Sequence, residues 1–455
     1  MNEQTASILN FQHILAPDGI LPDRQLHVDG QGVIQEIRPI PAAERSAVKW
    51  DGYLALPGMP NAHSHVFQRA LAGFGEARRG EDSFWSWREA MYRLALHVTP
   101  EQLHVIARQA YGEMLAAGFT SVAEFHYLHH LPDGTHSMAM ADAIIQAAED
   151  AGIRLCLLPV AYFTAGFAAA GAGPGGGQAP LAEQRRFVFE SVDDYLAMVE
   201  AVSIRSAGIA PHSLRAVPPS LLEELVAGSR QILGDDAAIH IHIAEQQREV
   251  TDCRDTHGKT PINLLADTIT LDEHWNLVHA THADAGERQR MLDAGARVVI
   301  CPLTEAYLGD GLFDATGFGR QGGELAIGSD SNARIDVFEE LRLLEYGQRL
   351  KNQARAQLAD EHGFTSLYRH CAEAGARASG LKSGRLEAGR LADIIAIDER
   401  SHGVTGHVAR TMVDALLVNG SSRDVVGVWV GGRKIMPTLV PDEFAATVQQ
   451  LLGTL

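Results

Sequence analysis

His63 and His65 lie two residues apart, after the run Leu54-Ala-Leu-Pro-Gly-Met-Pro-Asn-Ala62. Side chains two apart on an extended chain point to the same side, so both imidazoles can face one metal ion. Most isolated pairs of this kind are ordinary surface or core histidines, so the pair needs partners elsewhere in the chain. Polar residues recur at the ends of later apolar runs, at His212, Arg215, His240, His242, Glu245, His279, His282 and Asp330. Because imidazoles and carboxylates bind zinc, the pattern predicts a hydrolytic metal site if these run ends meet.

Short apolar strands alternate with helical stretches between about residues 57 and 384 and would bring these residues together. Amphipathic runs at 101–117, 138–151 and 287–294 lie between strands expected at 54–56, 120–127, 153–162, 204–210, 237–244, 276–283, 296–302 and 324–329. This alternation indicates parallel βαβ units. Eight strands fit a (β/α)₈ barrel, although an open doubly wound sheet would show the same local pattern. In a barrel the carboxyl ends of all strands share one face, which is where the polar residues fall.

The two ends of the chain differ from this middle because they consist of short strands separated by glycine, proline and aspartate turns. Strands are expected at 8–16, 25–29, 33–40 and 53–56, and again at 391–398, 415–419, 425–430 and 433–435. Gly431-Gly432 would form the turn between the last two strands. We therefore expect residues 1–56 and 385–455 to build one small β domain, with the barrel of residues 57–384 inserted into it.

The arrangement of these motifs resembles the amidohydrolase superfamily across essentially the whole chain. That family has a His-x-His after the first barrel strand, a histidine on each of strands 5 and 6, and an aspartate after strand 8. The resemblance implies an α/β fold, a distorted (β/α)₈ TIM barrel with a small β-sandwich formed from both chain ends. It also implies a metal held by His63, His65, His242 and Asp330, a three-nitrogen, one-carboxylate zinc set with room for a water.

His240 lies in phase with His242 and competes with it as the ligand. The resemblance favours His242, since Glu245 follows it in the His-x-x-Glu arrangement of the mononuclear deaminases. Two-metal members of the superfamily often bridge their ions with a carboxylated lysine on strand 4, but no lysine lies between Lys49 and Lys259. We therefore expect one Zn²⁺ per subunit, while a bridge from Glu124 stays as the less favoured alternative.

Zinc would lower the pKa of its water from 15.7 to roughly 7, so that hydroxide is available at neutral pH. Asp330, beside the metal, can take the proton of the water, and Glu245 can pass a proton to the leaving nitrogen. His279 would polarise the group under attack. These three residues are the expected catalytic set.

A narrower resemblance concerns the substrate. Pro57-Gly-Met-Pro-Asn-Ala-His-Ser-His-Val-Phe-Gln-Arg-Ala-Leu-Ala-Gly73, Phe84-Trp-Ser-Trp-Arg88 and the segment 301–313, CPLTEAYLGDGLF, are similar to the formimidoylglutamate deiminases. Those enzymes are hydrolases of C–N bonds in linear amidines. They convert N-formimino-L-glutamate to N-formyl-L-glutamate and ammonia in histidine catabolism, and metal-bound hydroxide would attack the formimino carbon. Leu303 and Tyr307 depart from the Thr and Asn usual in that family, and these changes would reshape the pocket.

By this resemblance Gln68, Arg88, Tyr127 and Arg215 would hold the two carboxylates of the substrate, and His212 would line the same site. The net charge of −19 makes local arginines necessary, since a small anionic substrate must enter against the overall field of the protein. Forked, charge-assisted contacts from arginine suit carboxylates. The glycine- and alanine-rich stretch 165–180 follows a predicted barrel strand, so it is either a flexible linker or a mobile lid.

Composition narrows the other possibilities. The net charge of −19 argues against binding to nucleic acid or to anionic membrane surfaces. Four scattered cysteines, no apolar run of membrane length and no signal-like N-terminus favour the cytoplasm. The resemblance implies a homodimer.

A zinc deaminase of a ring such as guanine, cytosine or a triazine is the alternative function, favoured by Phe84, Trp85 and Trp87. A barrel relative without catalysis would usually lack one of the ligands.

Overall fold

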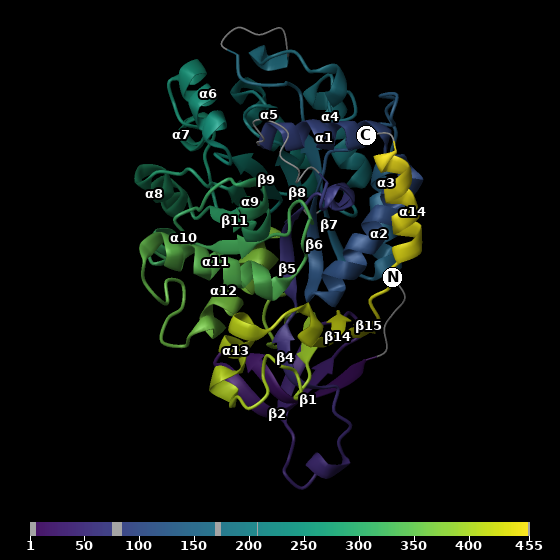
Figure 1. The fold of residues 1–455 in the computed structure, drawn as a ribbon, viewed down its shortest axis with the longest axis vertical. Helices are drawn as coiled ribbons and strands as arrows, with labels where there is room; N and C mark the ends of the chain where they lie inside the picture. Colours follow the sequence, from purple (N-terminus) through teal and green to yellow (C-terminus); the bar gives the residue numbers. More distant parts are fainter. Residues whose placement is uncertain (1–5, 75–83, 169–173, 207, 454–455) are drawn as a thin grey trace.

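The computed structural model describes residues 6–74, 84–168, 174–206 and 208–453, except for the side chains of residues 84–86 and 174. Both ends of the chain contribute to a seven-stranded sheet, drawn at the lower end of Figure 1. Its order is β15-β14-β13-β4-β1-β2-β3. The strands are β1 (Ser7–Ala16), β2 (Gly19–Val28), β3 (Ile34–Pro39), β4 (Gly52–Pro57), β13 (Ile394–Ile397), β14 (Val425–Val430) and β15 (Arg433–Ile435). The predicted β unit formed from both chain ends is therefore confirmed.

Strand β4 joins the two halves of this sheet because it pairs with β1 on one side and with β13 on the other. Phe11 and Trp429 come from opposite ends of the chain and meet edge to face, with ring centroids 5.6 Å apart. Burial of these two large rings ties the ends together. Gly431 and Gly432, at φ of 57° and 73°, form the expected turn between β14 and β15.

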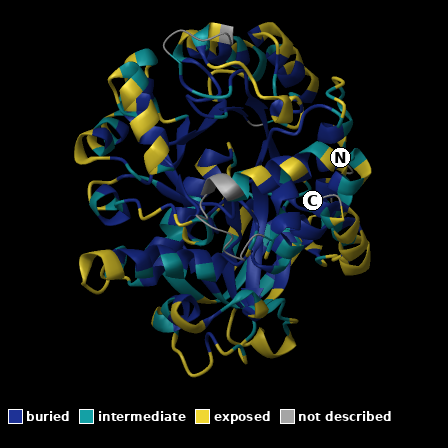
Figure 2. Ribbon diagram, turned by 45° about the horizontal axis from the view of Figure 1, so that its top comes forward, coloured by how far each residue is buried: buried dark blue, intermediate teal, exposed yellow. Residues whose placement is uncertain are grey.

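Eight parallel strands form the barrel, and they follow one another around it in chain order. They are β5 (Met59–Ser64), β6 (Phe119–His126), β7 (Arg154–Ala161), β8 (Gly208–Pro211), β9 (Ala238–Ile243), β10 (Trp275–His279), β11 (Arg297–Ile300) and β12 (Leu325–Ile327). A parallel bridge between Ser64 and Asp330 closes the ring. Almost every strand residue is buried, as Figure 2 shows in dark blue, because helices cover the outer face. The predicted barrel is confirmed.

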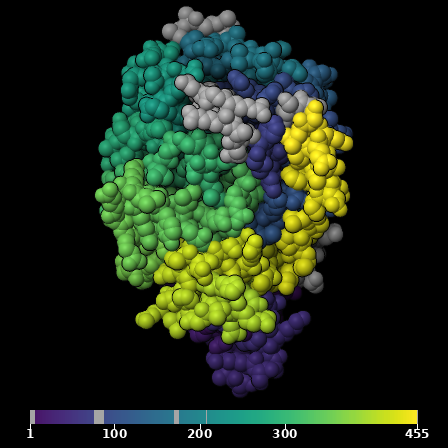
Figure 3. All heavy atoms as spheres, viewed as in Figure 1, coloured from purple at the N-terminus to yellow at the C-terminus, as the bar shows by residue number. Residues whose placement is uncertain are grey.

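The helices surround this barrel and pack its outer face (Figure 1). They are α1 (Phe84–His97), α2 (Pro100–Ala116), α3 (Ala139–Ala151), α4 (Val192–Val202), α5 (Pro219–Leu233), α6 (Gln247–His257), α7 (Pro261–Thr268), α8 (Ala285–Ala294), α9 (Pro302–Leu308), α10 (Ala315–Gly319), α11 (Val337–Asn352), α12 (Phe364–Ala378), α13 (Met412–Asn419) and α14 (Pro441–Leu452). Helix α14, yellow in Figure 3, lies along α2 on the outside of the barrel. None of the described helices is long and apolar enough to cross a lipid bilayer.

Two strand predictions are wrong. Residues 54–56 belong to β4 of the terminal sheet, and the first barrel strand is β5, which carries His63. The two strands abut at Gly58, where a Cβ atom would come within 2.3 Å of Thr120, so the chain passes between the sheets only without a side chain there. Residues 415–419 lie in α13, whose buried positions include Val413, Leu416 and Leu417, a helical spacing. The domain limits after residues 56 and 384 stay predictions.

Candidate active site with a metal-ligand cluster

A pocket at the carboxyl ends of the barrel strands gathers most of the predicted site residues. It is lined by His65, Gln68, Trp87, Arg88, Met91, Tyr127, His212, Arg215, His242, Glu245, His279, Leu308 and Asp330. His63 is fully buried beside this pocket, in contact with His65 and Asp330. Residues separated by most of the chain therefore meet on one face of the barrel, as expected for a site built on strand ends.

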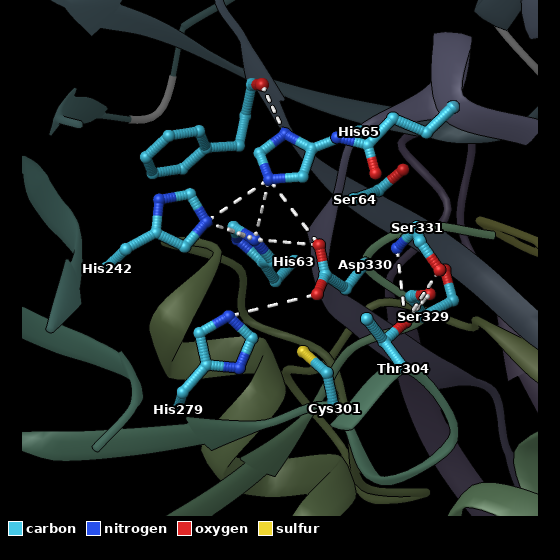
Figure 4. Close-up of polar contacts among 12 residues, drawn as sticks. His63, Ser64, His65, His242, His279, Cys301, Thr304, Ser329, Asp330 and Ser331 are labelled. Carbon is cyan, nitrogen blue, oxygen red and sulfur yellow. Dashed lines mark hydrogen bonds and ion pairs between the residues drawn. The ribbon is translucent and has the colours of Figure 1, made fainter. Parts of the chain in front are cut away.

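Four side chains form a compact cluster of metal-ligating atoms, shown in Figure 4: His63, His65, His242 and Asp330. Their ligand atoms all lie within 4.8 Å of one another. The Nε2 atoms of the three histidines are separated by 3.0 to 3.2 Å. The Asp330 Oδ1 atom lies 3.5 Å from His63 Nε2 and 3.4 Å from His65 Nε2. With Zn–N bonds of about 2.0–2.1 Å, two ligands of a tetrahedral ion lie roughly 3.3 Å apart, so this spacing fits.

Hydrogen bonds fix the orientation of two of these rings. The Nδ1 atom of His65 lies 3.0 Å from the carbonyl oxygen of Phe125, and Nδ1 of His242 lies 3.0 Å from that of His212. A carbonyl oxygen only accepts, so each Nδ1 carries the hydrogen and each neutral ring turns its Nε2 lone pair toward the cluster. Burial lowers the pKa of both histidines, which keeps them neutral. Lone pairs converging at this distance repel one another unless a cation lies between them, so the residues fit a metal.

His240, the competing ligand, lies elsewhere. Its Nε2 atom contacts the carbonyl oxygen of Ala378 at 2.8 Å, and it does not belong to the cluster. Glu124, the alternative bridge, accepts the backbone N–H of Val66 at 2.7 Å, and burial raises its pKa to about 8. Glu124 therefore holds the chain just after His65, and it is not one of the cluster residues.

The three expected catalytic residues lie side by side at the edge of the cluster. His279 Nε2 is 4.0 Å from Glu245 Oε1 and 3.8 Å from Asp330 Oδ2. Burial raises the pKa of Glu245 to about 7, against the opposing effect of His279 and Arg215. The pKa of Asp330 is lowered. Burial acts to raise it, but the interactions with His63, His65 and His279 outweigh burial, so the carboxyl group stays ionised. A carboxyl with a pKa near neutrality can both accept and donate a proton, which suits Glu245 to general acid–base work.

Glu305 was not anticipated, yet it contacts His279 directly. Its Oε1 atom lies 3.1 Å from His279 Nδ1 and also accepts the backbone N–H of Cys301 at 3.0 Å. Burial opposes the charge on His279, but Glu245, Glu305 and Asp330 outweigh it and raise its pKa to about 10. Glu305 stands four residues after Cys301, the residue that follows β11, a spacing that returns a side chain of α9 toward the strand end.

Backbone strain collects at the same place. Among the described residues, eight non-glycine positions have positive φ, and five of them are Ala244, His279, Ala280, Asp330 and Asn332. These residues follow or end β9, β10 and β12, where the chain leaves the barrel. Strained backbone of this kind persists where surrounding contacts hold it, and it concentrates at functional sites.

The expected substrate-binding residues form the outer part of the pocket. Gln68 Nε2 donates to the hydroxyl of Tyr127 at 2.9 Å, while Gln68 Oε1 is buried without a hydrogen-bond partner in the described part of the chain. Arg215 is 9% exposed and its Nε lies 3.9 Å from Glu249 Oε1. Burial opposes the charge on Arg88, but Tyr162 and Tyr92 outweigh it and raise its pKa. Two guanidinium groups, of the buried Arg215 and the half-buried Arg88, therefore line the pocket that holds the metal-ligand cluster.

Other expected features lie outside this pocket. Leu308 lines it, whereas Leu303 and Tyr307 are not among the lining residues. In the loop 165–180, Gln178 holds the base through hydrogen bonds with Ala165, Gly166 and Phe167, and residues 169–173 lie outside the described residues. The lid therefore stays a prediction. Trp87 is the aromatic residue of segment 84–88 that lines the pocket, and the side chains of Phe84 and Trp85 lie outside the described residues.

Known proteins resemble the chain along nearly its whole length. A formimidoylglutamate deiminase from Pseudomonas aeruginosa is 42% identical over 443 residues, which cover 94% of both chains. A 5-methylthioadenosine/S-adenosylhomocysteine deaminase from Halobacterium salinarum is 28% identical over 395 residues, covering 85% of this chain and 82% of the relative.

Solved structures agree with this result. An amidohydrolase from Brucella melitensis superposes with a TM-score of 0.85 and 39% identity, covering 98% of this chain and 99% of the other. An adenosine deaminase from Xanthomonas campestris with bound zinc has the same fold, with a TM-score of 0.78, 22% identity and coverage of 98% and 97%. The sequence pattern of the amidohydrolase family matches residues 54–435, which include every residue of the cluster. The chain belongs to the amidohydrolase family.

Proposed function

We propose that this protein is a zinc-dependent formimidoylglutamate deiminase, which hydrolyses N-formimino-L-glutamate to N-formyl-L-glutamate and ammonia. One observation carries the proposal: Arg88 and Arg215 line the same pocket as the metal-ligand cluster. In a protein of net charge −19, two cations beside a hydrolytic site, one buried and one half-buried, match a small substrate with two carboxylates. The 42% identity to the Pseudomonas aeruginosa deiminase supports the same substrate.

The outer pocket would hold the glutamate part of the substrate. Arg88 and Arg215 give charge-assisted hydrogen bonds to its carboxylates, which are roughly twice as strong as neutral ones. Gln68 and Tyr127 are already joined by a hydrogen bond and provide further polar contacts. His212 lies between these residues and the cluster, since its ring contacts both Tyr127 and His242, at centroid distances of 5.8 and 5.0 Å.

His63, His65, His242 and Asp330 would hold one zinc ion per subunit. When bound there, zinc would supply Lewis-acid chemistry, which polarises a substrate and lowers the pKa of a water from 15.7 to roughly 7. The carboxylate of Asp330 accepts a proton from the water that adds to the formimino carbon.

The other two catalytic residues act on the substrate. His279 donates a hydrogen bond to the group under attack, and the carboxyl of Glu245 delivers a proton to the terminal nitrogen. The proton that Asp330 took from the water passes to the same nitrogen, and the added hydroxyl group returns its proton to Glu245 as the bond between that nitrogen and the formimino carbon breaks. Ammonia leaves and the N-formyl product remains.

The deciding experiment measures ammonia release from N-formimino-L-glutamate by the zinc-loaded protein. Guanine, cytosine and 5′-methylthioadenosine serve as controls, because a deaminase of rings would accept one of them. Release from the formimino compound alone supports the proposal. Activity confined to a ring compound keeps the metal site and contradicts the substrate, and inactivity on all four compounds with zinc bound contradicts the proposal.

The bound metal, the assembly and the compartment belong to the same proposal. Metal analysis of the purified protein tests for one zinc ion per chain, against iron or manganese, which His₃Asp sets also accept. We further propose a cytoplasmic homodimer, as the family resemblance implies. Light scattering coupled to size-exclusion chromatography and fractionation of the source cells test these two points.

A further inference from the structure

A second group of metal-ligating atoms lies beside the first. The side chains of His279, Cys301 and Asp330 bring a nitrogen, a sulfur and an oxygen atom within 4.8 Å of one another. All three are buried: His279 ends β10, Cys301 directly follows β11, and Asp330 stands three residues after β12. Figure 4 shows the sulfur of Cys301 directed toward the gap between the His279 ring and the Asp330 carboxylate. No step of the proposed reaction uses Cys301.

The orientation of His279 suits a ligand. Its Nδ1 atom faces Glu305 Oε1 at 3.1 Å, so this nitrogen carries a hydrogen and donates it to the carboxylate. Its Nε2 atom faces Asp330 Oδ2 at 3.8 Å, and it can offer a lone pair once it has given up its proton. Histidines that bind metals in proteins almost always donate their other ring N–H to a carboxylate or a carbonyl group.

Asp330 can serve both groups, because its two oxygens face different ways. Oδ1 lies 3.5 and 3.4 Å from the Nε2 atoms of His63 and His65, and Oδ2 lies on the side of His279. A carboxylate placed in this way bridges two ions, which lie about 3.5–4 Å apart in two-metal sites. The second position is therefore compatible with an occupied first one.

The surroundings of Cys301 favour a cation over a free thiolate. The carboxylate of Glu305 accepts the backbone N–H of Cys301 at 3.0 Å, and a carboxylate oxygen of Asp330 lies within 4.8 Å of the Cys301 sulfur. The same negative charges attract a positive ion. A bound metal ion stabilises the thiolate directly, and the protons of the thiol and of His279 Nε2 pass to the buffer as the sulfur–metal and nitrogen–metal bonds form.

We propose that His279, Cys301 and Asp330 form a second, inhibitory cation site, which takes a thiophilic divalent ion such as zinc in excess. A thiolate and an imidazole select zinc-like ions over magnesium or calcium, which prefer oxygen ligands. An ion at this position engages Nε2 of His279, so His279 loses the hydrogen bond that it gives to the substrate. The binding itself is independent of the substrate, whereas the inhibition rests on the proposed function.

The test titrates the zinc-loaded protein with Cd²⁺ as the probe and compares the wild type with Cys301→Ser. Cys371→Ser is the matched control, since Cys371 is equally buried but lies in α12 outside the group. Ultraviolet absorption from thiolate-to-cadmium charge transfer, the amount of bound cadmium and the amount of retained zinc are measured together. A parallel titration measures ammonia release.

We expect the wild type and Cys371→Ser to bind one additional Cd²⁺ per chain, to show the absorption and to lose activity in step with it. Cys301→Ser should lack the absorption and need more than about tenfold more Cd²⁺ for the same inhibition. The proposal is overturned if Cys301→Ser binds cadmium like the wild type, or if the wild type binds the second ion and remains active. If Cys301→Ser does not fold, Cys301→Ala provides the same comparison. Absence of deiminase activity would contradict the proposed function and leave the cadmium-binding result unaffected. Failure of the proposed function can therefore be told apart from failure of the proposed second cation site.

Discussion

Replacing Arg215 by methionine removes one of the two cations from the pocket and keeps an unbranched apolar stem. The Arg215 side chain is 10% exposed, and its Nε atom has no hydrogen-bond partner in the described part of the chain. Glu249 Oε1 lies 3.9 Å from that atom, beyond hydrogen-bond distance. The donor is therefore available to a carboxylate of the substrate.

The expected loss follows from this geometry. A hydrogen bond to a charged partner contributes about 1.5–3 kcal/mol. Loss of one carboxylate contact at about 3 kcal/mol lowers kcat/KM roughly a hundredfold. Most of the change should be a rise in KM, because the contact exists before and during the reaction. Zinc content should stay unchanged, since Arg215 is not one of the cluster residues.

The assay is steady-state ammonia release, with two further substrates in which one carboxylate of N-formimino-L-glutamate is replaced by a carboxamide. Arg215→Met should tolerate one of these replacements and remain sensitive to the other. Arg88→Met should show the opposite pattern. Arg230→Met is the control, because Arg230 pairs with Asp272 and is not among the residues that line the pocket. Full activity of Arg215→Met, or equal sensitivity to both carboxamides, would refute the carboxylate-binding role.

Three further predictions concern the metal, the catalytic histidine and the fold. Chelation should abolish activity and lower Tm, and zinc at a hundred times its Kd should restore activity and about 2.7 kcal/mol of stability; an unchanged Tm would contradict metal binding by the folded chain. Glu305→Gln should lower kcat about 10–100-fold with little change in KM, because the charge beside His279 is lost. Glu340→Gln is its control, since Glu340 accepts the backbone N–H of Leu303, which lies in the same helix as Glu305. An equal loss in both variants would indicate that Glu305 has a merely structural role. Gly58→Ala should destabilise the protein by about 1–3 kcal/mol in chemical denaturation, because its Cβ would overlap Thr120; unchanged stability would show that the sheets can separate.

The sequence alone predicted the barrel and the residues that meet at its face. His63, His65, His242 and Asp330 were identifiable because each stands at the end of an apolar run, and parallel strands bring such ends together. The choice of His242 over His240 needed more than periodicity, since side chains two apart share a face. In the structure only His242 belongs to the cluster, because the Nε2 atom of His240 instead contacts the carbonyl oxygen of Ala378.

The remaining features depend on contacts between distant segments. Residues 54–64 form one continuous buried stretch that runs from β4 through Gly58 into β5, so burial of the segment could not show that the two strands belong to different sheets. Residues 415–419 are apolar and short, and nothing in their pattern distinguishes a strand from a helix. In the sequence Glu305 is one acidic residue of a helical segment, and only the folded structure shows that it contacts His279.

The seam that closes the barrel has a consequence for how the protein acquires its metal. Ser64 and Asp330 form the bridge between the first and the last barrel strand, and the backbone hydrogen bonds there join His65 to Asp330 and Asp330 to His63. During synthesis β5 leaves the ribosome first and β12 last, so the four-ligand site does not exist on a partly made chain. Metal uptake by all four ligands is thereby delayed until the last barrel strand has docked, and a chain that stops before β12 lacks Asp330 even when its three histidines are present. Capture of the ion thus reports that the barrel has closed.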